Sequence, residues 1–212
     1  MIFSRENIAH GFFVLMSSKI SATTKILRKV LIGLWLAVIV VCIGYYLANP
    51  SAFTAENIAA FLERFQGAIW LVYLIFSILR GITLLPSTPL VLAGTMLFPG
   101  QPWAVLGVSM TGILLSSTMI YYFSDFLGFD EYFESKNPDL SHKIKAKLEH
   151  PLGFLFVSGW AFFPLVPTDL VCYVAGTTRM NFIKFISAVA VGEVILCSLY
   201  IFFGGAFVNY MR

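Results

Sequence analysis

Charged side chains are scarce in this sequence. Lysine, arginine, aspartate and glutamate together make up 12% of its 212 residues, against roughly 25% in soluble domains. The hydrophobic share is 58%, and the mean hydropathy is +0.84. This composition excludes a soluble globular domain and predicts an integral membrane protein. The net charge of +3 is too small to indicate a nucleic-acid surface, so we expect no nucleic-acid partner.

Cysteine and histidine are also scarce, with three of each. Cys42, Cys172 and Cys197 lie in apolar runs without a C-x-x-C pair or a neighbouring histidine, which argues against a disulfide or a metal site. All three histidines lie outside the predicted membrane spans, and no serine–histidine–aspartate set occurs within them. We therefore expect no catalytic residue, no metal and no cofactor, and an enzyme ranks last among the possible functions.

Three long apolar runs predict membrane-spanning helices: Val30–Ala48, Trp103–Ser124 and Asn181 to about Val208. The first has 19 residues without a charge and would extend about 28 Å as a helix, enough to cross the hydrocarbon core. Residues 1–29 carry five cations and one acid, and this basic segment predicts a cytoplasmic N-terminus. We expect residues 49–208 to form the main membrane domain.

Two proline-containing stretches interrupt the apolar sequence, at residues 86–95 and 163–178. Both have the pattern P-x-x-P, then an apolar run, then Ala-Gly-Thr, with 8 residues from first proline to glycine in one copy and 12 in the other. Prolines at membrane depth end helices, and glycines permit close approach of backbones. The residues that we expect in these structural roles are Pro86, Pro89, Gly94, Pro164, Pro167 and Gly176.

Residues 67–85 could either cross the membrane or form one arm of a re-entrant hairpin. The second arm, residues 89–98, would extend only about 15 Å. A hairpin leaves eleven of the 14 lysines and arginines on the cytoplasmic side, whereas a crossing would move six of these eleven outside, against the positive-inside bias. We therefore predict re-entrant hairpins at about 67–98 and 152–178, joined through the span at 103–124 and a cytoplasmic linker at 125–150.

This order predicts an all-α membrane protein in which a re-entrant hairpin followed by a span occurs twice in opposite orientations. One transmembrane helix precedes this inverted repeat. Such repeats are a recurring plan in transporters, where the broken elements meet near the midplane. Arg80 and Asp169 lie near the two predicted hairpin tips. A charge at the bilayer centre costs at least ~2.5–3.5 kcal/mol, so we expect the two side chains to be paired or hydrated.

Arg80 is the candidate for binding the phosphate of a lipid headgroup, because a guanidinium can bind phosphate through two parallel hydrogen bonds. Asp169, and also Glu193, would hold Arg80 between lipids or accept a proton. The alternative is a permanent Arg80–Asp169 ion pair that only joins the two hairpins. Tyr173 would offer a hydroxyl to the cavity or, as tyrosines more commonly do, pack at the membrane interface.

The two proline motifs resemble those of the VTT-domain family, which is part of the DedA superfamily and is also called the SNARE-associated Golgi protein family. The motif residues are Leu84-Leu85-Pro86-x-x-Pro89…Ala93-Gly94-x-x-x-Phe98 and Phe163-Pro164-x-x-Pro167-x-Asp169…Tyr173-x-Ala175-Gly176. The resemblance covers about residues 55–208. It implies a multi-pass protein, expected in a bacterial plasma membrane, that moves lipids with anionic or phosphate headgroups without covalent chemistry.

DedA proteins place carboxylates in the first hairpin and arginines in the second, whereas this sequence has Arg80 in the first and Asp169 in the second. Two other functions stay open. Asp169 and Glu193 would form the ion site of a proton- or ion-coupled transporter. A scaffold that transports nothing would use the basic N-terminus and the linker to recruit partners.

Overall fold

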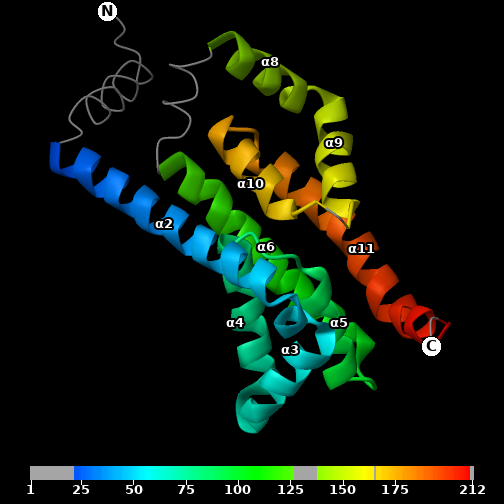
Figure 1. The fold of residues 1–212 in the computed structure, drawn as a ribbon. Helices are drawn as coiled ribbons and strands as arrows, with labels where there is room; N and C mark the ends of the chain where they lie inside the picture. Colours follow the sequence, from blue (N-terminus) through cyan, green and yellow to red (C-terminus); the bar gives the residue numbers. More distant parts are fainter. Residues whose placement is uncertain (1–21, 127–137, 165, 211–212) are drawn as a thin grey trace, which may run out of the picture. The chain divides into compact units, whose positions relative to one another are not determined.

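The computed structural model describes residues 22–126, 138–164 and 166–210, and all regular structure in these ranges is helical (Figure 1). Within them, four stretches are long and apolar enough to cross a membrane: Lys29–Ala48, Ala55–Gly81, Pro102–Ser124 and Phe182–Gly204. The prediction of an all-α integral membrane protein is therefore confirmed for the described part of the chain. Most of the basic segment 1–29 and part of the linker 125–150 lie outside the described residues.

The chain divides into two units, residues 1–38 and 39–212. Helix α2 (Ala22–Ala48) passes from the first into the second and begins eight residues before the predicted span at 30–48. Most of its described side chains are exposed, as expected for a helix in lipid. In chain order, the other helices are η1 (Pro50–Phe53), α3 (Ala55–Leu62), η2 (Glu63–Ala68), α4 (Ile69–Ile82), α5 (Thr88–Leu97), α6 (Pro102–Phe126), α8 (Pro138–Glu149), α9 (Pro151–Phe162), α10 (Thr168–Thr177) and α11 (Phe182–Tyr210).

The apolar stretch Ala55–Gly81 is folded back on itself. Helix α3 begins at the cap Thr54, whose hydroxyl oxygen accepts a hydrogen bond from the Asn57 N–H at 3.4 Å. The chain then kinks in η2 at Phe65, which has φ −100° and ψ 41°. Beyond the kink, the ring of Phe76 on α4 lies 5.6 Å from that of Phe61 on α3. Residues 15 apart in one straight helix would be separated by about 22 Å, so this stretch is two helices.

Helices α4 and α5 run antiparallel. The indole of Trp70, at the start of α4, stacks on the ring of Phe98, which follows α5, at 3.6 Å between centroids. Helix α6 then runs parallel to α4, because Tyr73 and Gly81 of α4 approach Ser109 and Ser116 of α6 in the same order. The Tyr73 and Ser109 hydroxyls are hydrogen-bonded at 2.6 Å.

In the second half of the chain, two antiparallel helices are again followed by a long helix that runs parallel to the first of them. Helices α9 and α10 also fold back on each other, and the Trp160 Nε1–H donates to the Pro167 carbonyl at 3.3 Å across the turn. Helix α11 runs parallel to α9, because the Ser158 hydroxyl donates to the Ala188 carbonyl at 2.9 Å and, further along both helices, Gly192 lies against Ala161. In Figure 1, α9, α10 and α11 lie together on one side of α6.

Helices α6 and α11 are antiparallel to each other. The ring of Trp103, early in α6, lies 4.9 Å from that of Phe202, late in α11. At the other end, Tyr121 of α6 stacks on Phe185 of α11 at 5.2 Å. The long helix of the triplet α4–α5–α6 therefore runs opposite to the long helix of the triplet α9–α10–α11.

The four motif prolines occupy two kinds of position. Pro86 and Pro164 lie in the turns between the paired helices. Pro89 lies in the first turn of α5 and Pro167 is the N-cap of α10, where a missing N–H costs no helical hydrogen bond. Each motif therefore ends one helix and starts the next.

Helix α10 approaches α6 closely because Gly176 has no side chain. A Cβ atom at Gly176 would overlap the Tyr121 carbonyl oxygen and the Ser124 hydroxyl. At Gly94, an added Cβ would lie 2.5 Å from the Tyr73 hydroxyl oxygen. Small residues at such crossings allow close packing of helices in lipid, where the hydrophobic effect does not hold helices together.

Gly176→Ala is expected to destabilise the fold by about 1–3 kcal/mol, because the Tyr121 carbonyl belongs to the backbone of α6 and cannot rotate away. The matched control is Gly107→Ala, also in a helix, where no atom lies within 4 Å of the added Cβ. This change should leave stability unchanged or raise it by up to about 1 kcal/mol. Thermal denaturation of the two variants in detergent, followed by size-exclusion chromatography, makes the comparison. Equal midpoints would contradict the close approach of α10 and α6.

Candidate functional site

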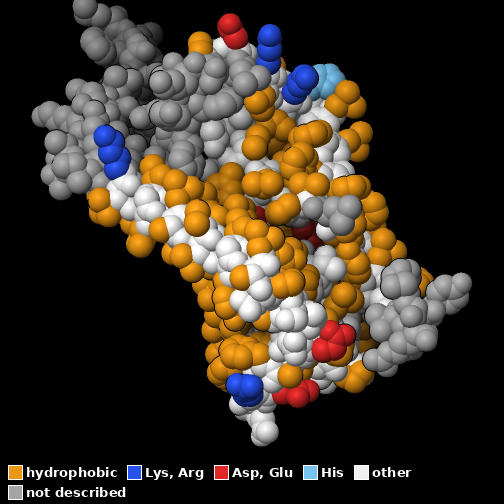
Figure 2. Space-filling view, in the orientation of Figure 1, with side chains coloured by type: hydrophobic (Ala, Val, Ile, Leu, Met, Phe, Trp, Pro, Cys, Tyr) orange, Lys and Arg blue, Asp and Glu red, His pale blue; other side chains and the backbone are white. Residues whose placement is uncertain are grey.

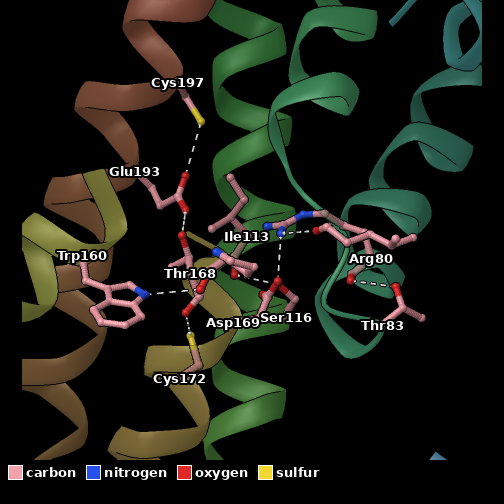
Figure 3. A network of polar contacts seen from close by, with 12 residues as sticks. Arg80, Thr83, Ile113, Ser116, Trp160, Thr168, Asp169, Cys172, Glu193 and Cys197 are labelled. Atoms are coloured by element: carbon pink, nitrogen blue, oxygen red, sulfur yellow. Dashed lines mark hydrogen bonds and ion pairs between the residues drawn. The ribbon is translucent and has the colours of Figure 1, made fainter. Parts of the chain in front are cut away.

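A buried ion pair joins the two triplets. Arg80 lies in the last turn of α4 and Asp169 in the first turn of α10, and their side chains come together as Figure 3 shows. Arg80 Nη1 lies 3.2 Å from Asp169 Oδ2. Arg80 is 8% exposed and Asp169 is 1% exposed. The structure therefore brings together two charged residues that are 89 positions apart in the sequence.

The end of α4 positions the guanidinium. The Thr83 hydroxyl donates to the Arg80 carbonyl at 2.9 Å, and the Leu85 N–H donates to the same carbonyl at 3.3 Å. Leu84 adopts a φ of 58°, in the left-handed region that non-glycine residues rarely enter. This turn also places the Leu85 carbonyl 3.5 Å from Arg80 Nη1. The backbone of the turn thus contributes to holding the arginine side chain.

The start of α10 positions the carboxylate. Asp169 follows the N-cap Pro167, so it lies at the helix end where a negative charge is stabilised by the helix dipole. Gly81 allows its approach, because an added Cβ would lie 3.0 Å from Asp169 Oδ1 and 2.7 Å from Ser116 Cβ. The sequence reasoning did not identify Gly81. The one feature of the sequence that could have indicated Gly81 is its position directly after Arg80 in an apolar run.

Glu193 lies in α11 and is fully buried. The Thr168 hydroxyl donates to Glu193 Oε1 at 2.5 Å, and Cys197 Sγ lies 3.8 Å from Oε2. The hydrogen-bond partners of Glu193 are therefore Thr168 and Cys197 rather than Arg80. Thr168 directly precedes Asp169. The first turn of α10 therefore contains one of the two acids, Asp169, and donates a hydrogen bond to the other, Glu193. Thr168 is a second residue that the sequence reasoning missed, since nothing in its local pattern indicates a carboxylate partner on α11.

The ion pair leaves hydrogen-bonding capacity unused. Arg80 Nη2 and Asp169 Oδ1 are both buried and have no hydrogen-bond partner among the described residues. An arginine–carboxylate pair can form two parallel hydrogen bonds, but this pair forms one. One strong donor and one strong acceptor therefore remain for another group, and buried polar atoms without partners are uncommon in native structures.

Two cavities adjoin Arg80. The smaller, which we call the tip cavity, has a volume of about 50 Å³ and lies between the two turns, lined by Arg80, Ser87, Phe163, Pro164, Pro167 and Thr168 among others. The larger, which we call the apolar groove, has a volume of about 460 Å³. Its lining includes Phe53, Ile58, Phe61, Phe76, Leu79 and Arg80. Arg80 thus lines both a small cavity and a large apolar groove.

Tyr173, the fourth predicted site residue, lies elsewhere. It is half-buried on α10 and lines a third hollow, of about 860 Å³, bounded by α8, α9 and α10. The tip cavity and the apolar groove do not include it. Within the described residues, no group of three or more histidine, cysteine or acidic side chains could hold a metal ion.

Comparison with protein families gives one match, to the VTT domain over residues 85–206. The matched region begins five residues after Arg80 and contains Asp169 and Glu193. Comparisons with curated proteins and with solved structures gave no match. The matched region covers more than half of the chain and both proline motifs, so the resemblance seen in those motifs is confirmed, and the chain belongs to the VTT domain family of membrane proteins.

Proposed function

We propose that this protein moves phosphate-bearing lipids across the bilayer as a transporter or scramblase, without covalent chemistry, and that Arg80 binds the lipid phosphate. The observation that carries this proposal is the position of Arg80. Its side chain lines both the tip cavity and the apolar groove, and its buried Nη2 has no hydrogen-bond partner in the part of the chain that the structure describes. A phosphate needs strong donors, and acyl chains need an apolar surface. Arg80 and the groove supply these side by side.

The helix lengths support re-entrant hairpins. Helices α4, α5, α9 and α10 contain 14, 10, 12 and 10 residues. At 1.5 Å per residue each extends roughly 15–21 Å, less than the ~30 Å hydrocarbon core. The turns at residues 83–87 and 163–167 would then lie at membrane depth, where irregular backbone is tolerated if it lines a cavity. Both turns line the tip cavity.

The helix directions support an inverted repeat. The triplets α4–α5–α6 and α9–α10–α11 each have a folded-back pair followed by a long helix, and the two long helices are antiparallel. The distribution of lysine and arginine favours a cytoplasmic N-terminus and a cytoplasmic linker at 125–150. In this arrangement the Arg80–Asp169 contact lies where hairpins from opposite sides meet, which is where inverted-repeat transporters place their sites.

Electrostatics explains why Asp169 faces Arg80. An arginine alone at membrane depth is costly, and the carboxylate compensates its charge when no lipid is bound. A lipid phosphate offers the same geometry of acceptor oxygens as the carboxylate. It would first accept a hydrogen bond from Nη2, which Asp169 leaves free, and then compete for Nη1. Arg80 would thus remain paired with an anion throughout a transport cycle.

A second candidate function is proton- or ion-coupled transport. Its specific support is that two buried acids lie close to one cation: Asp169 pairs with Arg80, and Glu193 accepts a hydrogen bond from Thr168, the residue before Asp169. With all three ionised the group would carry a net negative charge, which burial disfavours. A proton or a cation would restore neutrality. Lipid movement in vesicles without any ion gradient favours the first function, and strict dependence on a gradient favours the second.

The double variant Arg80→Gln/Asp169→Asn tests phosphate binding without leaving one buried charge unpaired. The chain should fold, but movement of a fluorescent phosphatidylglycerol in reconstituted vesicles should slow about tenfold or more. Such a factor corresponds to the ~1.5–3 kcal/mol of a hydrogen bond to a charged group. The control Arg64→Gln removes an exposed cation of η2 and should transport normally. Normal transport by the double variant would exclude Arg80 as the phosphate-binding residue.

Exchanging the charges, as Arg80→Asp/Asp169→Arg, separates a binding role from a purely structural one. We expect this exchange to restore the ion pair and the folded state but not transport, because the arginine would then extend from α10 rather than from α4 beside the groove. Fluorescence-detected chromatography measures folding, and the vesicle assay measures transport. Recovery of both would mean that the pair only joins the two hairpins.

The proposed topology is testable by cysteine labelling. In a variant whose three native cysteines are replaced by alanine, Gln101→Cys and Lys145→Cys each introduce one exposed thiol. A membrane-impermeant maleimide added to intact cells should label position 101 and leave position 145 unlabelled until the cells are opened. If residues 67–85 crossed the membrane instead, the two positions would exchange sides and the labelling pattern would be reversed.

A further inference from the structure

The hollow between α8, α9 and α10 is, like the apolar groove, large enough for a ligand. Its volume of about 860 Å³ is within the ~300–1,000 Å³ range of ligand sites. None of the residues that line it also lines the tip cavity or the apolar groove. We call it the α8–α10 hollow, and nothing in the proposed transport role of Arg80 accounts for it.

The walls of this hollow are apolar. Phe156 and Trp160 contribute from α9, and Leu170 and Val174 from α10. Three of these side chains are 40% exposed or more, namely Phe156, Leu170 and Val174. The indole N–H of Trp160 already donates to the Pro167 carbonyl, so its polar group needs no partner from a ligand. In a membrane protein, exposed apolar walls of this kind fit hydrocarbon chains.

The rim of the hollow is basic. Lys147 of α8 and His150, the N-cap of α9, both line it and are both exposed. His150 Nδ1 accepts a hydrogen bond from the Leu152 N–H at 3.3 Å, which leaves the other ring nitrogen as a donor. Among the described residues, no acidic side chain lines the hollow. Figure 2 shows basic side chains gathered at this end of a broad apolar surface.

Lys184 removes the main electrostatic obstacle to an anion at this rim. The carbonyls at the end of a helix carry partial negative charge, and α8 ends beside the hollow. The ammonium of Lys184, on α11, donates to the carbonyls of Leu148, Glu149 and His150 at 2.8, 2.8 and 2.7 Å. It neutralises this helix end and fixes the corner between α8 and α9. Lys147 and His150 are thereby held beside the apolar walls.

We propose that the α8–α10 hollow binds a diacyl phospholipid with an anionic headgroup. The acyl chains pack against Phe156, Leu170 and Val174, and the phosphate is bound by Lys147 and His150. Charge complementarity favours an anionic lipid, because the described lining residues include basic groups and no acid. Lys143 and Lys145, exposed on the same helix, add attraction to an anionic membrane surface. This site is separate from Arg80 and does not require that the protein transports lipid.

Native mass spectrometry of the full chain, purified from vesicles of equal phosphatidylglycerol and phosphatidylcholine, tests the rim. The wild-type chain should retain phosphatidylglycerol in preference. Lys147→Gln/His150→Gln should lower that preference about fivefold or more, since one basic group near an anionic surface corresponds to about this factor. Lys145→Gln removes a charge from the same helix without touching the hollow and should leave the preference nearly unchanged. Equal losses in both variants would assign the effect to general surface charge and overturn the proposal.

Val174→Trp tests the walls by filling the hollow, and Val194→Trp is its matched control. Both valines are 41% exposed, but only Val174 lines the hollow. Retention of phosphatidylglycerol should fall several-fold in the first variant alone. Unchanged retention together with a change in oligomeric mass would overturn the proposal and assign this face to a second copy of the chain. In the Arg80→Gln/Asp169→Asn background, Lys147→Gln/His150→Gln should lower the preference for phosphatidylglycerol by the same factor as in the wild-type chain, so failure of the transport proposal is distinguishable from failure of this one.

Discussion

The contact between Arg80 and Asp169 is the interaction on which the arrangement of this membrane domain depends. A charge buried among apolar helices is costly unless an opposite charge lies within reach. Here the two charges come from the ends of two short helices, α4 and α10, so pairing them fixes both turns against each other. The pairing in turn requires Gly81, because a side chain there would displace Asp169 and Ser116. The need to pair Arg80 with Asp169 thus requires a glycine at position 81 and a close approach of α4, α6 and α10.

Helix α6 provides the common surface for this packing. Buried serines recur on it at intervals of seven and then eight residues, at Ser109, Ser116 and Ser124, which places them on one face of the helix. Ser116 and Ser124 donate their hydroxyl protons to carbonyls three residues earlier in α6, so they fill little space and leave no unpaired donor. Helices α4 and α10 can therefore lie against α6 at short distance. In lipid, this close packing and its hydrogen bonds replace the hydrophobic effect as the source of helix association.

Composition and hydropathy were enough to predict the membrane class and the helices, because long apolar runs have few alternative structures in lipid. The proline motifs also located both turns, and the opposite charges of Arg80 and Asp169 indicated a pairing. The sequence did not indicate that Thr168 donates a hydrogen bond to Glu193, or that Tyr173 lines a different hollow from the two that Arg80 lines. Both depend on the rotation of α10 about its axis, which its packing on α6 and α9 determines. The kink at Phe65 lies two residues before Gly67, where the first predicted hairpin begins.

The unequal charges of the site constrain any mechanism. Asp169 contacts only one nitrogen of Arg80, and neither Arg80 Nη2 nor Asp169 Oδ1 has a partner among the residues described, so the pair is weaker than a bidentate one. A phosphate bound to Nη2 would add a negative charge beside Asp169. Glu193 is also near, because it accepts a hydrogen bond from Thr168, the residue that precedes Asp169. Three anions around one guanidinium would repel one another at low dielectric. Under the proposed function, the lipid would therefore displace Asp169 from Arg80, or the acids would take up a proton. In either case the turn at the start of α10 would have to respond to the lipid.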